Sequence, residues 1–204
     1  IQNKALELSL FLSLPASIVL LIASNQIVSA LFGYGQFSES SVSNTAQALY
    51  YFSLGLPAFA MIKVFSNFFF ANHDTKTPFY ISLISVLLNI LISVYFFRSI
   101  GFIIIPISTT ISSWFNTIVL FLFLQKRNLF KFNDIFIKIF FKIVFSSILM
   151  GLFFNYLIII FNEQLSFENP LKCVYLILSV FLGLSFYIFT SYLIKAFKLE
   201  DIKL

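Results

Sequence analysis

The sequence contains six apolar runs of about 20 residues, and this feature constrains the fold more than any other. The hydrocarbon core of a bilayer is about 30 Å thick, a distance that about 20 residues of α-helix span. Inside lipid the backbone must satisfy its own hydrogen bonds, so each run predicts a helix and the chain an all-α, polytopic bundle of about six transmembrane helices. Asn44 and Gln47, at the start of the second run, resemble a capping box. The predicted spans are residues 6–31, 46–71, 79–97, 102–124, 136–161 and 171–194.

The composition excludes an ordinary water-soluble domain. Of the 204 residues, 60% are hydrophobic and 10% are charged, whereas charged residues make up about a quarter of a soluble domain. The net charge of +5 comes from residues near the ends of the apolar runs and not from a continuous basic stripe, so we expect no nucleic-acid partner. Membrane lipids are the expected surroundings of the chain.

The basic residues predict an orientation, because Lys and Arg accumulate on the cytoplasmic side of a membrane protein. If the start of the chain is cytoplasmic, eleven of the 13 basic residues fall in or near the inside half, and only Arg98 and Lys172 fall outside. We therefore expect both ends of the chain in the cytoplasm. The eleven are Lys4, Lys63, Lys76, Lys126, Arg127, Lys131, Lys138, Lys142, Lys195, Lys198 and Lys203.

Residues that catalysis or metal binding would require are scarce. His73, the single histidine, lies beside Asp74 in a short polar segment typical of a solvated turn. Cys173, the single cysteine, excludes an internal disulfide and offers no metal-ligand cluster. Catalysis needs convergent titratable groups, and no phosphate-binding loop or nucleophile motif occurs. We expect no enzyme activity, metal or cofactor, while a coupling ion or the membrane potential stays open as a driving force.

Lys63 lies inside the second apolar run, about two turns before the end of that run. An ammonium group in hydrocarbon costs about 2.5–3.5 kcal/mol on insertion scales, so it either extends to the membrane surface or faces a hydrated cavity. Asn67 lies four residues later on the same helical face. The sequence leaves both interpretations open, and the second makes Lys63 and Asn67 candidates for the path of an anionic head group.

Asn89 and Asn116 are polar residues inside the third and fourth runs. Small polar residues commonly mediate helix contacts in lipid, which is one interpretation of them and of a hydroxyl cluster ahead of Trp114. The other interpretation is that Asn89 and Asn116 belong to the path of the substrate. The hydroxyl cluster comprises Ser108, Thr109, Thr110, Ser112 and Ser113.

Several segments carry more specific patterns. They are Leu14-Pro15-Ala16 at the end of a run of Leu and Phe, Leu31–Ser38, Thr45–Phe59, Lys63-Val64 and Asp74-Thr75-Lys76-Thr77-Pro78. The stretch from Thr45 to Pro78 is the strongest, and its order, spacing and placement at two helix ends resemble the MurJ (MviN) family of bacterial lipid II flippases. After residue 125 the likeness is only hydropathic.

The resemblance implies the architecture of this family within the multidrug/oligosaccharidyl-lipid/polysaccharide exporter superfamily. Its full-length members have about fourteen transmembrane helices, in two six-helix lobes and a C-terminal pair. Residues 1–128 would then be the last four helices of the second lobe, and residues 129–204 the C-terminal pair, whose groove is proposed to hold the lipid tail. Because the chain starts at Ile1 and not at Met, we expect it to begin mid-protein. The N-terminal lobe and the cavity arginines of the family would lie upstream.

The resemblance also implies a function. The family moves lipid II, the undecaprenyl-linked peptidoglycan precursor, from the inner to the outer leaflet of the bacterial inner (cytoplasmic) membrane by alternating access, which serves cell-wall synthesis and cell shape. Lys63 and the cytoplasmic loop Asp74–Pro78 carry over by motif match. Two alternatives stay open: a polysaccharide-unit flippase or multidrug exporter of the same superfamily, and a membrane-embedded transferase that uses lipid-linked sugars. For a transferase, only Glu7, Glu39 and His73 are eligible catalytic residues.

Overall fold

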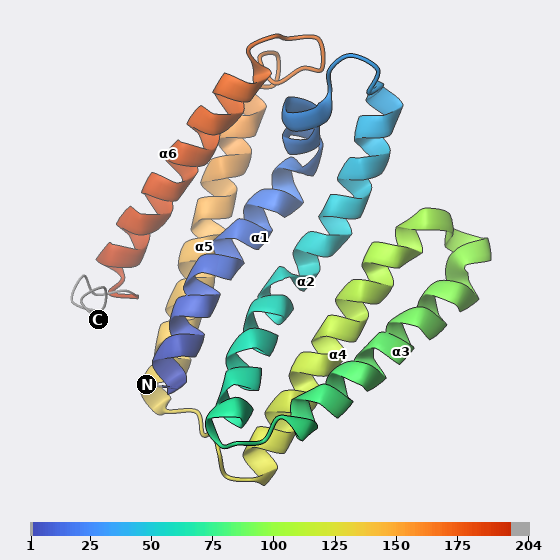
Figure 1. The fold of residues 1–204 in the computed structure, drawn as a ribbon. Coiled ribbons are helices and arrows are strands. Elements are labelled where there is room, and N and C mark those ends of the chain that lie inside the picture. Colours follow the sequence, from blue (N-terminus) through green and yellow to red (C-terminus); the bar gives the residue numbers. More distant parts are fainter. Residues whose placement is uncertain (1, 197–204) are drawn as a thin grey trace. The chain divides into compact units, whose positions relative to one another are not determined.

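Each of the six predicted apolar runs forms an α-helix in the computed structural model, which describes residues 2–196. The helices are α1 (Gln2–Phe32), α2 (Glu39–Ala71), α3 (Lys76–Ile100), α4 (Ile104–Lys126), α5 (Asp134–Ile160) and α6 (Lys172–Leu193) (Figure 1). The predicted all-α fold is confirmed. Lys198 and Lys203, which contribute to the count of basic residues, lie outside the described residues, as does the end of the expected segment 129–204.

Helices α3 and α4 form an antiparallel hairpin (Figure 1). The turn is a short 3-10 helix, η1 (Gly101–Ile103), and Gly101 has a φ of 75°, a left-handed value that glycine adopts without steric cost. By length and composition, the described chain holds five helical stretches that could cross a membrane, one of which is the whole hairpin of 51 residues, Lys76–Lys126. A straight helix of that length would measure about 75 Å, far more than a hydrocarbon core of about 30 Å. The hairpin therefore provides two crossings, of 25 and 23 residues.

The second helix begins earlier than its apolar run predicts. It starts at Glu39, where the Ser38 hydroxyl accepts a hydrogen bond of 3.3 Å from the Ser41 amide and caps the first turn. Asn44 lies inside the helix, so the capping box predicted there is wrong. The error has a physical reason: hydropathy detects only the part of a helix that is apolar, and the first two turns of α2 are polar.

Helices α2, α4 and α6 end in the same way, with a left-handed residue that is not glycine. These residues are His73, Asn128 and Lys195, with φ values of 57°, 55° and 55°. In α2 the His73 amide donates to the Phe70 carbonyl and the Asp74 amide to the Phe69 carbonyl, each at 3.0 Å. This pair of bonds is the Schellman motif, which satisfies carbonyls that the end of a helix leaves free, and the same pair closes α4 and α6.

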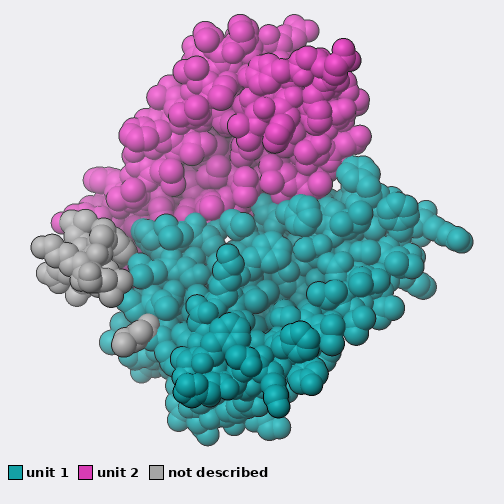
Figure 2. All heavy atoms as spheres, in the orientation of Figure 1, with its two compact units in different colours: residues 1–13, 51–137 teal, residues 14–50, 138–204 magenta. Residues whose placement is uncertain are grey.

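The chain divides into two compact units by its internal contacts (Figure 2). One comprises residues 1–13 and 51–137, and so holds α3, α4 and the second half of α2. The other comprises residues 14–50 and 138–204, and holds α6 with most of α1 and α5. These boundaries differ from the division at residue 128 that the resemblance implies. That division concerns the lobes of a whole transporter, and it stays a prediction.

An aromatic cluster packs the first unit at the end where α2 and α4 finish. Its members come from α2, α4, the following loop and the start of α5, and are Phe65, Phe68, Phe121, Phe130, Phe132 and Phe136. Phe68 stacks on Phe130 with ring centroids 5.6 Å apart, and Phe132 stacks on Phe136 at 5.0 Å. Such ring pairs add to the stabilisation that burial provides.

Much of the apolar surface is exposed, as it must be when lipid is the solvent. The side chains of Val94 and Tyr95 in α3 are 70% and 78% exposed, and Phe181 in α6 is 67% exposed. A water-soluble protein rarely leaves large contiguous apolar faces uncovered. The exposed residues therefore agree with the transmembrane assignment of these helices.

Candidate functional site

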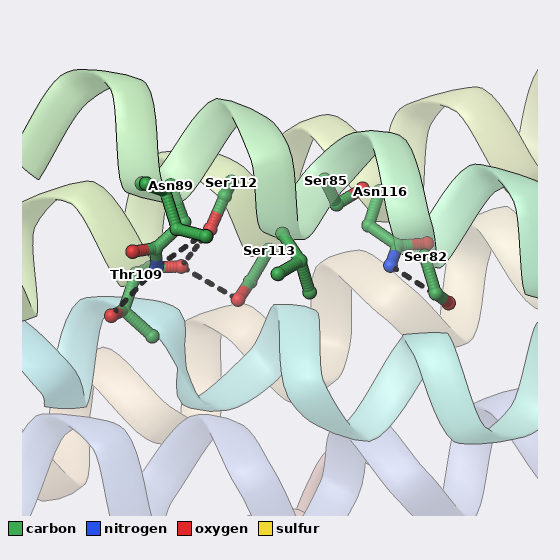
Figure 3. A pocket seen from close by; sticks show the side chains of 9 residues that line it. Ser82, Ser85, Asn89, Thr109, Ser112, Ser113 and Asn116 are labelled. Atoms are coloured by element: carbon green, nitrogen blue, oxygen red, sulfur yellow. Dashed lines mark hydrogen bonds between the residues drawn. The ribbon is translucent and has the colours of Figure 1, made fainter.

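A polar cavity of about 410 Å³ lies between α3 and α4 (Figure 3). The residues that line it are Ser82, Ser85, Val86, Asn89 and Ile90 of α3 with Thr109, Ser112, Ser113 and Asn116 of α4. The polar members recur three or four residues apart, so they share one face of each helix. The cavity opens to the surface beside the exposed side chains of Val86 and Ile90, and the exposed surface of the hairpin is largely apolar.

Asn89 is the centre of a hydrogen-bond network in this cavity. Its Nδ2 donates to Thr109 Oγ1 at 3.0 Å and lies 3.4 Å from Ser112 Oγ (Figure 3). Beside the cavity, the hydroxyls of Ser93 and Ser108 are 2.6 Å apart, and Ser108 is fully buried. The network ties α3 to α4, and it keeps amide and hydroxyl groups together in an apolar environment.

Asn116 lines the other end of the cavity and is less well satisfied than Asn89. Its Nδ2 donates to Ser82 Oγ at 3.4 Å (Figure 3), whereas its buried Oδ1 has no hydrogen-bond donor within the described residues. A buried carbonyl without a donor costs about 1–3 kcal/mol. A water molecule or a polar ligand that donates to this oxygen would remove that cost.

The structure brings two of the four predicted pathway residues together and leaves the other two apart from them. Asn89 and Asn116 line the same cavity. Lys63 and Asn67 are exposed residues of α2 and do not belong to its lining. Nothing in this geometry tests the role of any of the four, so that role stays a prediction.

The segment from Asp74 to Pro78 was predicted as a loop, but only Asp74 and Thr75 lie between α2 and α3, and the remaining three residues form the first turn of α3. A residue far along the chain holds this segment. Asp74 Oδ1 accepts a hydrogen bond of 3.0 Å from the Thr77 amide and so caps the first turn of α3. Arg127, which follows α4, forms an ion pair with the other carboxylate oxygen of Asp74 and donates to Thr77 Oγ1 at 3.0 Å. Thr75 and Lys76 are exposed, and Pro78 is buried.

The contacts of Asp74 also change its acidity. Hydrogen bonds from the Thr77 side chain and amide are the main reason that the pKa of Asp74 is lowered from 3.8 to about 2. Burial opposes them, and the neighbouring Arg127 guanidinium adds a smaller lowering effect. A lowered pKa means that the ion pair is at full strength above about pH 4 and is lost as the pH falls through about 2. Asp74 is therefore ionised at every physiological pH.

Sequence reasoning missed Arg127 as a partner of this loop. It assigned Arg127 only to the group of basic residues that set orientation, because Arg127 lies 53 residues from Asp74 in the sequence. A signal was available, since the loop holds an aspartate and both segments are predicted to lie on the same side of the membrane. The signal did not distinguish Arg127 from the adjacent Lys126.

The described residues include no group of three or more His, Cys, Asp or Glu side chains that could hold a metal ion. The cavity between α3 and α4 instead presents neutral amide and hydroxyl oxygens, which bind water, polar ligands and hard cations. None of the residues that line it is titratable. This arrangement suits the binding or passage of a polar group better than acid–base catalysis.

Comparison with known proteins decides the family. The family profile described as lipid II flippase MurJ matches residues 1–198. The chain belongs to the MurJ family. This confirms the family to which the sequence motifs point, and with it a multi-pass membrane protein whose relatives are transporters rather than enzymes.

Individual MurJ proteins match nearly all of this chain. The probable lipid II flippase MurJ of Rickettsia prowazekii (strain Madrid E) is 32% identical over 203 residues, which cover 98% of this chain and 40% of that protein. The probable lipid II flippase MurJ of Thermotoga maritima is 34% identical over 194 residues, or 95% of this chain and 37% of that protein. A solved structure of lipid II flippase MurJ in an inward closed conformation superposes with a TM-score of 0.76 at 25% identity, covering 94% of this chain and 38% of the other. The chain thus spans about 40% of the length of its MurJ relatives.

Proposed function

We propose that the intact protein to which this chain belongs flips lipid II from the inner to the outer leaflet of the bacterial cytoplasmic membrane and so serves peptidoglycan synthesis. The observation that carries the proposal is the family match over residues 1–198. The likeness to a solved MurJ structure over 94% of the chain supports it. The activity needs more than this chain, because alternating access rocks one lobe of a transporter against another.

The proposal assigns a part of the transporter to each region. Residues 1–128 supply the last four helices of the second lobe, and residues 129–204 supply the C-terminal pair, where the polyprenyl tail lies in an apolar groove. The missing N-terminal lobe supplies the other wall of the cavity. The basic residues support an orientation with both ends of this chain in the cytoplasm.

Within this arrangement Lys63 and Asn67 meet the anionic head group of lipid II. Lys63 is an exposed cation on a transmembrane helix, so it needs either the membrane surface or a hydrated cavity. Asn89 and Asn116 contribute neutral oxygens and amides to the polar path. The attraction between an ammonium and a diphosphate favours Lys63 as the first contact.

The test is complementation in a strain depleted of its own lipid II flippase. The intact protein should restore growth and cell shape, and Lys63→Gln should reduce flipping at equal expression. Lys126→Gln, which removes an exposed lysine at the end of α4, serves as the matched control. A well-expressed intact protein that fails to restore growth would reject the lipid II assignment in favour of a polysaccharide-unit flippase or drug exporter. Conversion of lipid II into a new covalent product would favour a transferase. Full activity of Lys63→Gln would instead support the interpretation that the Lys63 side chain extends to the membrane surface and does not contact the head group.

A further inference from the structure

The polar atoms of the motif residues Asp74 and Thr77 form hydrogen bonds with each other and with Arg127. Asp74 uses Oδ1 for the Thr77 amide and Oδ2 for the Arg127 guanidinium. Thr77 uses its amide for Asp74 and its hydroxyl for Arg127. These atoms are therefore occupied within the protein, and they are not arranged to contact a head group.

Arg127 also connects the ends of three helices. Its backbone closes α4, because its amide donates to the Phe123 carbonyl at 3.1 Å. Its guanidinium carbon lies 5.8 Å from the ring centroid of Phe69 in the last turn of α2, and its nitrogens reach the first turn of α3. A cation at the C-terminal end of α4 is further stabilised by the helix dipole.

The geometry distinguishes this pair from an ordinary surface ion pair, which contributes little to stability. The guanidinium forms a fork with two acceptors on two residues, and such forked charge-assisted bonds are directional. The Asp74 side chain is 19% exposed, whereas the Arg127 side chain is 43% exposed, so the pair is buried on the aspartate side only. The neighbouring aromatic cluster, defined above, holds the same ends of α2 and α4.

We propose that Arg127 is a positioning residue: it clamps the Asp74–Pro78 loop to the end of α4, so that the ends of α2, α3 and α4 move as one body during transport. The proposal rests on the proposed function for its role in transport but not for the existence of the clamp. It assigns the loop motif to the binding of Arg127 and not to the binding of substrate. The clamp should therefore affect the rate of flipping and leave lipid II binding unchanged.

The experiment is a double-mutant cycle in the intact protein. Asp74→Asn keeps an oxygen that can cap α3 and removes the charge, and Arg127→Gln removes the guanidinium. Arg127→Lys keeps the charge but cannot form the fork. Lys126→Gln removes the same charge one residue away and is the matched control. Flipping rate, lipid II affinity and thermal unfolding are measured for the wild type, the single variants and the double variant at equal protein amounts.

Each of Asp74→Asn and Arg127→Gln should slow flipping by about three- to tenfold, and the double variant should be no slower than either, because both remove the same interaction. Arg127→Lys should recover only part of the rate, and Lys126→Gln should behave as the wild type. Additive losses, or wild-type rates in both single variants, would overturn the clamp. A loss of lipid II affinity that equals the loss of rate would do so as well, because it would place the loop in contact with substrate.

Thermal unfolding separates failure of the clamp from failure of the proposed function. If the wild-type protein does not flip lipid II, the proposed function fails. The unfolding temperatures of the wild type, Asp74→Asn, Arg127→Gln and the double variant still test the clamp. Asp74→Asn and Arg127→Gln should each lower the unfolding temperature, and the double variant should lower it by less than the sum. Additive shifts in temperature would overturn the clamp without reference to transport.

Discussion

At the scale of single residues, Lys172 is the least expected feature of this protein. Lys172 is the first residue of α6, and its side chain is 1% exposed. The distribution of basic residues predicts that this end of α6 lies on the outer side of the membrane. Lys172 Nζ donates to the Gly33 and Phe167 carbonyls, both at 2.8 Å, and lies 4.4 Å from the ring centroid of Tyr34. One ammonium thus joins the loop after α1 to the loop before α6. Gly33 permits this approach, since a Cβ there would lie 2.9 Å from the ring of Phe167.

Replacing Lys172 with Met should destabilise the protein by about 2–3 kcal/mol, because the change removes the donor from the buried Gly33 carbonyl and from the partly buried Phe167 carbonyl. Unfolding of the intact protein in detergent would measure the loss. Lys138→Met, which removes an exposed lysine at the start of α5, should change stability by less than about 0.5 kcal/mol. Equal stability of the two variants would contradict the structural role of Lys172.

The burial of Lys172 was beyond prediction from the sequence for a definite reason. The sequence shows a lysine after Pro170, at the end of a polar loop, where a basic residue is ordinarily hydrated. One carbonyl that binds its ammonium belongs to Gly33, 139 residues away. The predicted orientation requires only the position of Lys172 along the chain. The contacts of its side chain depend instead on how the loop after α1 packs against the loop before α6, which the sequence does not show.

At the scale of the helices, α4 is fastened to α2 by three side chains that donate to backbone carbonyls. Thr110 Oγ1 donates to the Tyr51 carbonyl at 2.7 Å, and Trp114 Nε1 donates to the Leu54 carbonyl at 3.0 Å. Thr117 Oγ1 shares its hydrogen between the Ala58 carbonyl at 3.2 Å and the Ser113 carbonyl of its own helix at 2.9 Å. The donors lie four and three residues apart, on one face of α4. The acceptors surround Pro57, whose ring removes a backbone hydrogen bond from α2.

Thr110→Val and Thr117→Val each keep the shape of the side chain and remove the donor. We expect each to destabilise the protein by about 1 kcal/mol in detergent unfolding. Thr45→Val is the control, because the Thr45 hydroxyl donates only to the Ser41 carbonyl of its own helix. If all three variants unfold alike, the contacts between α4 and α2 do not contribute to stability.

The hydroxyl cluster of α4 shows what helical periodicity can predict and what it cannot. The sequence predicts that these residues mediate contacts between helices, and the structure places them on two faces of α4. Thr110 faces α2, whereas Thr109, Ser112 and Ser113 line the cavity beside α3. Helical spacing places the two sets on different faces, but only the packed structure shows which face meets which helix.

At the scale of the whole molecule, the sequence predicts the number and approximate positions of the transmembrane helices. It does not predict features that depend on tertiary contacts between distant segments. Six runs give six helices because a bilayer sets the length of each run. The polar start of α2 is missed because it lies beyond the apolar part of that helix. The division into two units, which cuts through α1, α2 and α5, leaves no trace in hydropathy, because it depends on contacts between distant segments.

The orientation is a testable property at this scale. Cys173 is the single cysteine of this chain, is partly exposed and lies at the start of α6. In an intact protein where it is the only cysteine left, a membrane-impermeant maleimide should label Cys173 in spheroplasts, because the basic residues place this end of α6 outside. A cysteine introduced by Lys126→Cys should react only after lysis. The reverse pattern would invert the proposed topology.

The left-handed residues that close α2, α4 and α6 have a consequence for how the protein is made. Each ending is complete within the last turn of its helix and the next three residues, because the Schellman bonds use only local amides and carbonyls. A helix that carries its own stop signal needs no later part of the chain to define where it ends. We therefore expect each of these boundaries to be set while the ribosome is still synthesising downstream residues, so that a helix such as α4 can leave the insertion machinery with its C-terminal end already formed.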